Sequence, residues 1–136
     1  MRTIALSILI CLLACQSNKM NNNQTHPYIV VLGIAQDAGY PQANCNKQCC
    51  EKAWENKNLT KYVSCIALVD PISKQQWLFD ATPDIKFQLQ ELEKITNINP
   101  INGIFLTHAH IGHYVGLLQL GREVMGTQNM PVYAME

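Results

Sequence analysis

The sequence predicts an α/β fold, and three observations support this. Short apolar and β-branched runs, which are typical of buried strands, recur along the chain and are separated by a segment with helical apolar spacing. The expected order of strand, strand, strand, helix, strand, loop, helix, strand is that of an α/β domain. The 136 residues are 48% hydrophobic and 15% charged, which is a globular composition.

Three strands are expected before the first long helix. Tyr28–Ile34, Cys65–Asp70 and Gln76–Asp80 are rich in apolar and β-branched residues. Ile72–Gln75 is short enough to form the turn of a hairpin between the second and third strands. Asp80 is therefore expected at a strand end, exposed to any cleft that forms there.

The second half of the chain is expected to alternate helices and strands. A helix should start at Thr82–Asp84, which offers a capping residue, a proline at the first position and an acid facing the helix dipole. The apolar residues that follow at helical spacing predict its buried face: Ile85, Leu89, Leu92 and then Ile95 or Thr96. Ile104–Leu106 is the next expected strand, Tyr114–Met125 a further helix, and Pro131–Met135 opens a last strand.

Three of the four histidines lie within six residues, directly after the strand Ile104–Leu106. These are His108, His110 and His113. The backbone turns just past a strand end, so side chains this close in sequence can converge on one point. Neutral imidazole is the commonest side-chain ligand of zinc and related metals, so the cluster predicts a metal site. The alternative is a set of loop histidines that form local hydrogen bonds and bind nothing.

The stretch Thr107–His113 resembles the His-x-His-x-Asp-His loop of the metallo-β-lactamase superfamily. In that superfamily the first two histidines hold one metal, and the aspartate and last histidine serve a second. His108, His110 and His113 match this pattern, whereas Gly112 stands in the position of the aspartate. Glycine has no ligating group, so a single metal is the better expectation. The resemblance also implies that Asp80 supports the metal loop; a turn or capping aspartate is the alternative.

Cys45, Cys49 and Cys50 form a second cluster, with the spacing Cys-x3-Cys-Cys. Thiolates are strong zinc ligands, but only three are local, so a fourth ligand would have to come from elsewhere. The alternatives are a disulfide within the cluster or to Cys65, and reduced cysteines that serve packing. A bridge between the adjacent Cys49 and Cys50 is disfavoured by disulfide geometry.

The cluster follows the turn Gly39–Gln42, and this order sharpens the resemblance. It is similar to the branch of the superfamily that contains the protein B of pyrroloquinoline quinone synthesis, in which such a turn precedes Asn-Cys and further cysteines that hold a structural zinc. Asn44 and Cys45 match, while the later cysteines are spaced differently. The resemblance implies that residues 28–136 form the first half of an αββα sandwich.

The N-terminus has the pattern of a bacterial lipoprotein signal peptide over residues 1–15. The apolar run Ile4–Leu13 is too short to span a bilayer, which takes about 20 helical residues. Leu12–Cys15 resembles a lipoprotein cleavage box, which predicts a lipid on Cys15 and residues 16–27 as a flexible tether. We therefore expect a protein anchored to a bacterial membrane in the cell envelope, where disulfides can form. A lone buried helix is the alternative.

These patterns together predict a metal-dependent hydrolase that acts on a small-molecule substrate. Zinc is the expected metal, with iron or manganese as alternatives, because imidazole suits all three. The net charge of zero gives no reason to expect a nucleic-acid partner. Residues 115–136 contain no His or Asp to complete the site, so we expect an N-terminal fragment that is inactive alone. The alternative is a non-catalytic lipoprotein that binds a metal or a partner.

Overall fold

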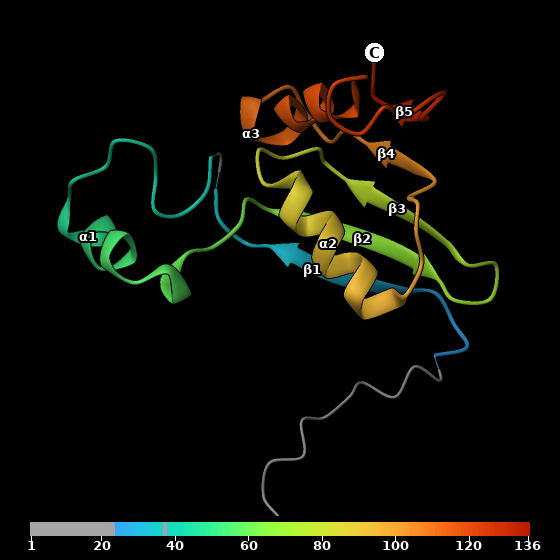
Figure 1. Ribbon diagram of the computed structural model, residues 1–136, viewed down its shortest axis with the longest axis horizontal. Coiled ribbons are helices and arrows are strands. Elements are labelled where there is room, and N and C mark those ends of the chain that lie inside the picture. Colours follow the sequence, from blue (N-terminus) through green and yellow to red (C-terminus); the bar gives the residue numbers. More distant parts are fainter. Residues whose placement is uncertain (1–23, 37) are drawn as a thin grey trace, which may run out of the picture.

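The computed structural model describes residues 24–36 and 38–136, so the predicted signal peptide, Cys15 and most of the tether lie outside the described residues. Its centre is a five-stranded sheet in the order β1-β2-β3-β4-β5 (Figure 1). The strands are β1 (Tyr28–Gly33), β2 (Cys65–Asp70), β3 (Gln75–Phe79), β4 (Gly103–Phe105) and β5 (Val132–Tyr133). The helices are α1 (Gln48–Glu55), α2 (Ile85–Thr96) and α3 (Ile111–Tyr114), with 3₁₀ turns η1 (Lys57–Leu59) and η2 (Val115–Leu120).

The strands change direction of pairing at the middle of the sheet. β1, β2 and β3 pair antiparallel, whereas β4 pairs parallel to β3 and β5 pairs parallel to β4. Parallel neighbours need a crossover connection, and α2 and α3–η2 supply the two crossovers. The predicted α/β class is therefore confirmed, and so is each predicted strand to within a residue or two, apart from a shorter last strand.

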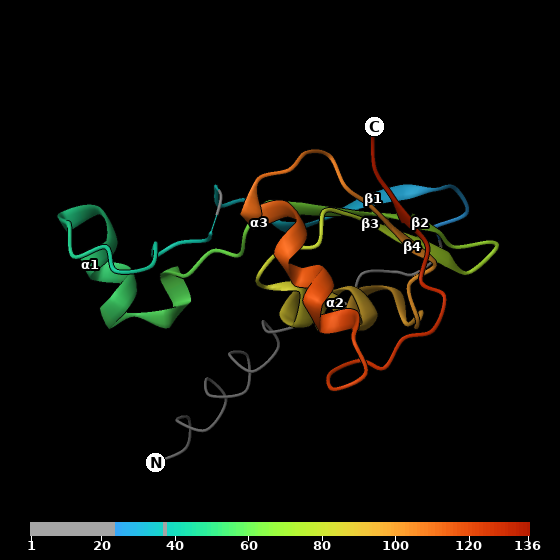
Figure 2. The same ribbon diagram turned by 90° about the horizontal axis from the view of Figure 1, so that it is seen from above.

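One face of the sheet forms the core under α2 and α3–η2, which lie on the same side of it (Figure 2). Alternate residues of each strand point to this face, as the pleat requires. The buried apolar residues of the sheet and α2 that meet there include Val30, Leu32, Ala67, Val69, Leu78, Ile85, Leu92 and Ile104. In the described part of the chain, every helix falls short of the length and apolar character that a bilayer-spanning helix needs.

No described helix covers the opposite face of the sheet (Figure 2), which carries exposed apolar side chains such as Val31 and Tyr133. The strand register aligns one cross-strand row there: Val31, Ile66, Phe79, Phe105 and Tyr133. Its three rings stack, with centroids 5.1 Å apart for Phe79 and Phe105 and 4.6 Å apart for Phe105 and Tyr133. Val31 is 63% exposed and Tyr133 is 48% exposed. Within the described residues this face is therefore an open apolar surface.

The start of α2 differs from the prediction. The helix begins at Ile85, so Pro83 precedes it instead of occupying its first turn. Thr82 is fully buried, and its hydroxyl accepts a hydrogen bond from the Asp84 N–H at 3.1 Å while donating to Gln88 at 2.6 Å. The apolar face predicted for this helix is confirmed, with the addition of the buried Gln88.

The predicted helix Tyr114–Met125 is wrong in its extent. The α-helical part is only α3, which is followed by η2 and then by turns from Gly121. The cause lies at Gly116, whose N–H donates to the Ala81 carbonyl at 2.9 Å. A Cβ at this position would lie 2.2 Å from the Thr82 carbonyl oxygen. The backbone at Gly116 is therefore pressed directly against the segment that follows β3.

This close approach predicts that Gly116→Ala destabilises the fold. An added methyl group has no room against backbone atoms, and overpacking of this kind typically costs about 1–3 kcal/mol of unfolding free energy. The matched control is Gly121→Ala, whose new Cβ would lie 3.5 Å from its nearest neighbour, the Leu118 carbonyl oxygen. The unfolding free energy of this variant should stay within about 0.5 kcal/mol of wild type. Urea titration followed by circular dichroism measures both. Equal stability of the two variants would contradict the contact.

Candidate metal centre

The candidate metal centre lies where β3 and β4 end. Because these strands are parallel neighbours, their carboxyl ends meet at one edge of the sheet. Asp80 directly follows β3, and Thr107 and His108 follow β4 after one further residue. The Asp80 N–H donates to the Phe105 carbonyl at 2.8 Å, which holds the two strand ends together.

The Asp80 carboxylate accepts hydrogen bonds from several groups at this edge of the sheet. It is only 6% exposed, and its backbone has a left-handed φ of 74°, a conformation that aspartate tolerates better than most residues. One carboxylate oxygen accepts from the Thr107 N–H at 2.8 Å, and the other accepts from His113 Nδ1 at 2.8 Å. Asp80 thus contacts the histidine loop as expected, although its support of a bound metal stays a prediction.

His108 and His110 present the best-placed pair of ligand atoms. The Nε2 atom of His108 lies 3.1 Å from the Nδ1 atom of His110. Tetrahedral zinc with Zn–N bonds of about 2.0–2.1 Å needs its nitrogens about 3.3 Å apart, so the pair fits this metal with little movement. Both residues are exposed, which leaves the pair accessible from solvent.

His113 lies beside the pair but is held differently. Its ring centroid is 4.1 Å from that of His108, and its Nδ1 atom is bonded to Asp80, which leaves Nε2 free. In residues 24–36 and 38–136, the one group of three ligand residues whose donor atoms all lie within 4.8 Å of one another consists of cysteines, not these histidines. The structure therefore brings His108 and His110 together as a pair, with His113 as a neighbour.

The short helix α3 fixes the position of His113. The His113 N–H donates to the His110 carbonyl at 2.9 Å, and the His113 carbonyl accepts from the Ala81 N–H at 2.8 Å. Gly112 is buried in this helix and brings no ligand to it. The geometry is thus consistent with the expectation of a single metal, since no carboxylate stands in the loop between His110 and His113.

The second cluster lies in a lobe to one side of the sheet (Figure 1). Cys45, Cys49 and Cys50 place their sulfurs within 4.8 Å of one another, and the last two are 4.0 Å apart. Tetrahedral zinc with Zn–S bonds of about 2.3 Å needs sulfurs about 3.8 Å apart, so these thiols fit the metal as well. All cysteines in the described part of the chain are free thiols, which does not favour the disulfide alternative.

Hydrogen bonds within this cluster shift the pKa values of Cys45 and Cys50 in opposite directions. A bond from Cys50, together with the Lys47 N–H, lowers the pKa of Cys45. The same bond to Cys45 raises the pKa of Cys50. Because a metal binds the thiolate and not the thiol, Cys45 is more ready to ligate than Cys50.

Two aromatic side chains, which sequence reasoning missed, hold the cysteine lobe in shape. The Tyr40 hydroxyl donates to the Cys49 carbonyl at 2.6 Å, and the Trp54 indole N–H donates to the Cys45 carbonyl at 2.7 Å. The helix α1, which was also not predicted, carries Cys49, Cys50 and Trp54. The local sequence contains the cysteine spacing but no signal for these carbonyl contacts.

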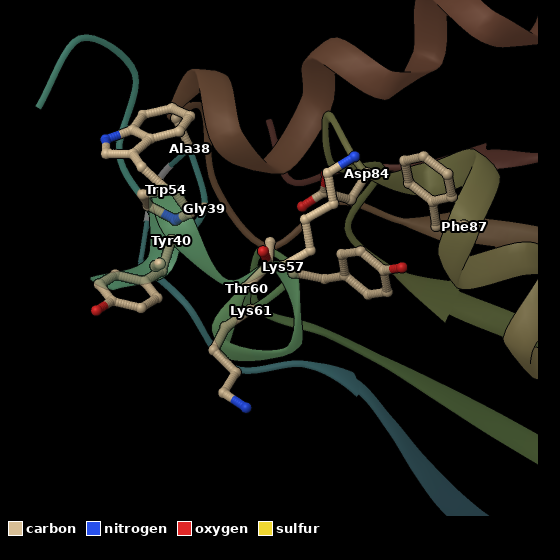
Figure 3. Close-up of a pocket in the computed structure, with 12 residues that line it drawn as sticks. Ala38, Gly39, Tyr40, Trp54, Lys57, Thr60, Lys61, Asp84 and Phe87 are labelled. Carbon is tan, nitrogen blue, oxygen red and sulfur yellow. The ribbon is translucent and has the colours of Figure 1, made fainter. Parts of the chain in front are cut away.

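A cavity of about 490 Å³ lies between this lobe and α2 (Figure 3). Trp54 and Phe87 stand on opposite sides of it, and the amine of Lys61 points away from the other labelled side chains. A second hollow of about 520 Å³ is lined by the three cysteines. Neither hollow is lined by the histidines, so the concave surface and the imidazole pair are separate features. We place the candidate centre at the histidines, because their chemistry and spacing fit a metal.

Comparison with known proteins shows what the chain resembles. The family described as "Beta-lactamase superfamily domain" matches residues 75–136. Coenzyme PQQ synthesis protein B of Methylorubrum extorquens (strain PA1) is 33% identical over 100 residues, and the same-named protein of Xanthomonas campestris pv. campestris (strain B100) is 29% identical over 98 residues. Each match covers 68% of this chain and 33% of the relative, so the match spans about a third of the relatives' length.

Two solved structures share the fold. The crystal structure of Zn²⁺-bound PqqB from Methylobacterium extorquens has a TM-score of 0.64 and 32% identity, and the likeness covers 79% of this chain and 36% of that one. A diphosphatase from the PhnP family has a TM-score of 0.60 and 24% identity, covering 81% of this chain and 42% of its own. The predicted fold class and the resemblance stated from the sequence are confirmed.

The buried Cys65 provides a test of the geometry around Asp80. Its Sγ lies 3.7 Å from the Asp80 carbonyl oxygen, and burial raises the pKa of the Cys65 thiol to about 12, with the negative charge of Asp80 adding to the effect. At about pH 8 its thiolate fraction should be roughly a thousandfold below that of an ordinary cysteine. In the folded, metal-free protein, iodoacetamide should modify the exposed Cys49 and spare Cys65, as read by peptide mass spectrometry. Unfolding in urea should abolish the difference, and equal labelling before unfolding would contradict the burial.

Proposed function

We propose that the protein is a metal-dependent, PqqB-like hydrolase of a small molecule, because a beta-lactamase superfamily domain matches residues 75–136 and the fold resembles that of a Zn²⁺-bound PqqB. The observation that carries the proposal is the separation of 3.1 Å between His108 Nε2 and His110 Nδ1, just past the end of β4. This spacing is close to the nitrogen–nitrogen separation of about 3.3 Å that tetrahedral zinc needs, and imidazole is a common zinc ligand. The match spans a third of its curated relatives' length, so the activity of the whole protein is part of the proposal.

His108 and His110 would hold the metal through Nε2 and Nδ1, and His113 would serve as a third or second-site ligand. Zinc fits the spacing, and iron or manganese would be held by the same nitrogens. When bound, zinc supplies Lewis acidity and lowers the pKa of a water ligand to about 7. With Gly112 in the loop, the chain offers no carboxylate there for a second ion.

The remaining residues of the site divide it into a buried and an open side. On the buried side, Asp80 accepts hydrogen bonds from His113 and Thr107 and so orients the loop. On the open side, His108 and His110 are exposed, and Ile111 beside them is 61% exposed. A small substrate can approach only from the open side, where the apolar Ile111 side chain would contact it.

For the substrate we propose an oxygen-rich small molecule. One structural neighbour is a diphosphatase, and the curated relatives act in the synthesis of coenzyme PQQ; both names are compatible with such a substrate. The zero net charge of the chain argues against nucleic acid as the partner. Fold likeness alone does not fix the reaction, so the choice rests on the experiment below.

We also propose a structural zinc at Cys45, Cys49 and Cys50. The sulfur spacing fits, and the hydrogen bonds of Tyr40 and Trp54 to the carbonyls of Cys49 and Cys45 preorganise the loop that carries them. A fourth ligand is absent from the described group, which leaves one position for water or for a ligand from outside it.

For location, we propose attachment to a bacterial membrane through a lipid on Cys15, with residues 16–27 as the tether. The support for this is the pattern of the N-terminal sequence. Palmitate labelling of the expressed protein, with Cys15→Ser as the comparison, would test it.

The second candidate function is a non-catalytic lipoprotein that binds a metal or a partner. The observation in its favour is that the two larger hollows described above lie at the cysteine lobe and are not lined by the histidines. A protein of this kind would bind zinc and hydrolyse nothing.

Removing either imidazole of the pair should weaken zinc binding and abolish hydrolysis. His108→Ala and His110→Ala are made in a Cys45→Ser, Cys49→Ser, Cys50→Ser background, which removes the other metal site. Each variant should lower the affinity for zinc at least about tenfold, because a ligand is lost. Competition with a chromophoric chelator measures this affinity. The control is His26→Ala, an exposed histidine that precedes β1.

Hydrolysis is followed with bis(4-nitrophenyl) phosphate and with a 4-nitrophenyl ester. Activity that persists in the His108, His110 double variant would exclude the enzyme proposal. Zinc binding that depends on both histidines, without turnover of either probe, would favour the second candidate.

A further inference from the structure

Thr107 occupies a position between the carboxylate and the first histidine that the proposed site does not yet use. Its hydroxyl oxygen lies 2.9 and 3.0 Å from the two carboxylate oxygens of Asp80. The same oxygen lies 2.9 Å from Nδ1 of His108. The hydroxyl therefore connects Asp80 to His108. The Asp80 carboxylate itself makes no direct hydrogen bond to His108.

The protons of this chain of groups can be assigned by counting donors and acceptors. An ionised carboxylate only accepts, so the single hydroxyl proton of Thr107 must point to Asp80. The Thr107 oxygen then offers only lone pairs to His108, and the Nδ1 atom of His108 must carry the proton that bonds to it. The opposite assignment would place hydroxyl lone pairs against carboxylate oxygens at 2.9 Å, which is repulsive.

This assignment determines which nitrogen of each ring is free. His108 with a proton on Nδ1 has its lone pair on Nε2, the atom that faces His110 at 3.1 Å. His113 donates its own Nδ1 proton to Asp80 at 2.8 Å, so its lone pair is also on Nε2. In the metal-free protein, His110 donates from Nδ1 to His108 Nε2, and this proton must leave Nδ1 before that atom can bind a metal.

We propose that Thr107 is a positioning residue that sets the tautomer of His108, so that one carboxylate orients two histidines: His113 directly and His108 through the threonine hydroxyl. The inference rests on the proposed function only in taking the histidines as metal ligands. Its consequence is that Thr107 raises metal affinity without touching the metal. Metal-ligating histidines need a fixed partner on their other nitrogen, and loss of such a partner typically weakens metal binding about 10–100-fold.

A purely structural role for Thr107 would look different. Its N–H also bonds to Asp80, at 2.8 Å, and this bond does not depend on the side chain. Thr107→Val keeps the N–H and the branched shape and removes only the hydroxyl. Thr107→Ser keeps the hydroxyl and removes only the methyl group. The two variants therefore separate the effect of the hydroxyl hydrogen bonds from the effect of side-chain packing.

The first measurement is the tautomer of each ring in the zinc-free protein, by long-range ¹H–¹⁵N NMR with ¹⁵N-labelled histidine. It is made at about pH 8.5, some two units above the ordinary pKa of histidine, so that the rings are neutral. Wild type and Thr107→Ser should show His108 protonated on Nδ1. Thr107→Val should shift His108 toward the form protonated on Nε2, while His113 stays protonated on Nδ1.

The second measurement is zinc affinity in the cysteine-free background described above. Thr107→Val should lower the zinc affinity about tenfold or more, and the zinc affinity of Thr107→Ser should stay within about twofold of wild type. The matched control is Thr127→Val, which removes a threonine hydroxyl that bonds to the Leu120 carbonyl and to no histidine. Should Thr107→Val not fold, Thr107→Ala, at the same exposed position, takes its place.

The inference is overturned if His108 keeps the same tautomer and zinc the same affinity without the hydroxyl, or if Thr107→Ser behaves like Thr107→Val. These results can be told apart from a failure of the proposed function. If the histidines do not bind the metal, wild type would bind zinc no better than His108→Ala. The NMR comparison in zinc-free protein would still decide the role of Thr107.

Discussion

The buried carboxylate of Asp80 is the interaction on which this edge of the protein depends. It receives hydrogen bonds from Thr107, two residues after β4, and from His113 in α3, while the Asp80 backbone N–H bonds to β4. A nearly buried charge is costly unless it is fully hydrogen-bonded, and here every side-chain polar atom that is buried in the described residues has a partner. The cost of burying this carboxylate is offset only when both strands and the helix are in place, so site and fold form together.

Much of this arrangement could be predicted from the sequence, because it depends on local patterns. The strand at Cys65–Asp70 and the buried face of α2 are visible as alternation and helical spacing. The histidine loop is visible as spacing after an apolar run. What the sequence could not reveal depends on contacts between distant residues. The helix breaks where the Gly116 N–H bonds to the Ala81 carbonyl, and the role of Thr107 appears only once Asp80, 27 residues away, lies beside it.

The three possible states of the cysteine cluster could not be separated from the sequence for the same reason. Spacing alone permits a disulfide, a metal or free thiols, since each needs sulfurs that are close. The structure adds the carbonyl contacts of Tyr40 and Trp54, which shape the loop from outside, and it places Cys65 in the core beside the Asp80 carbonyl. Cys65 therefore belongs to the sheet and its chemistry is that of a packing residue, separate from the lobe.

The open sheet face has a consequence for the protein in solution. Its stacked rings of Phe79, Phe105 and Tyr133 form a continuous strip, and Gly103 leaves room for the neighbouring Trp77 and Tyr133 because a Cβ there would lie 3.3 Å from both. Salts that are excluded from protein surfaces, such as sulfate, strengthen the burial of apolar area. Such salts would therefore favour association of this chain through this strip of aromatic side chains.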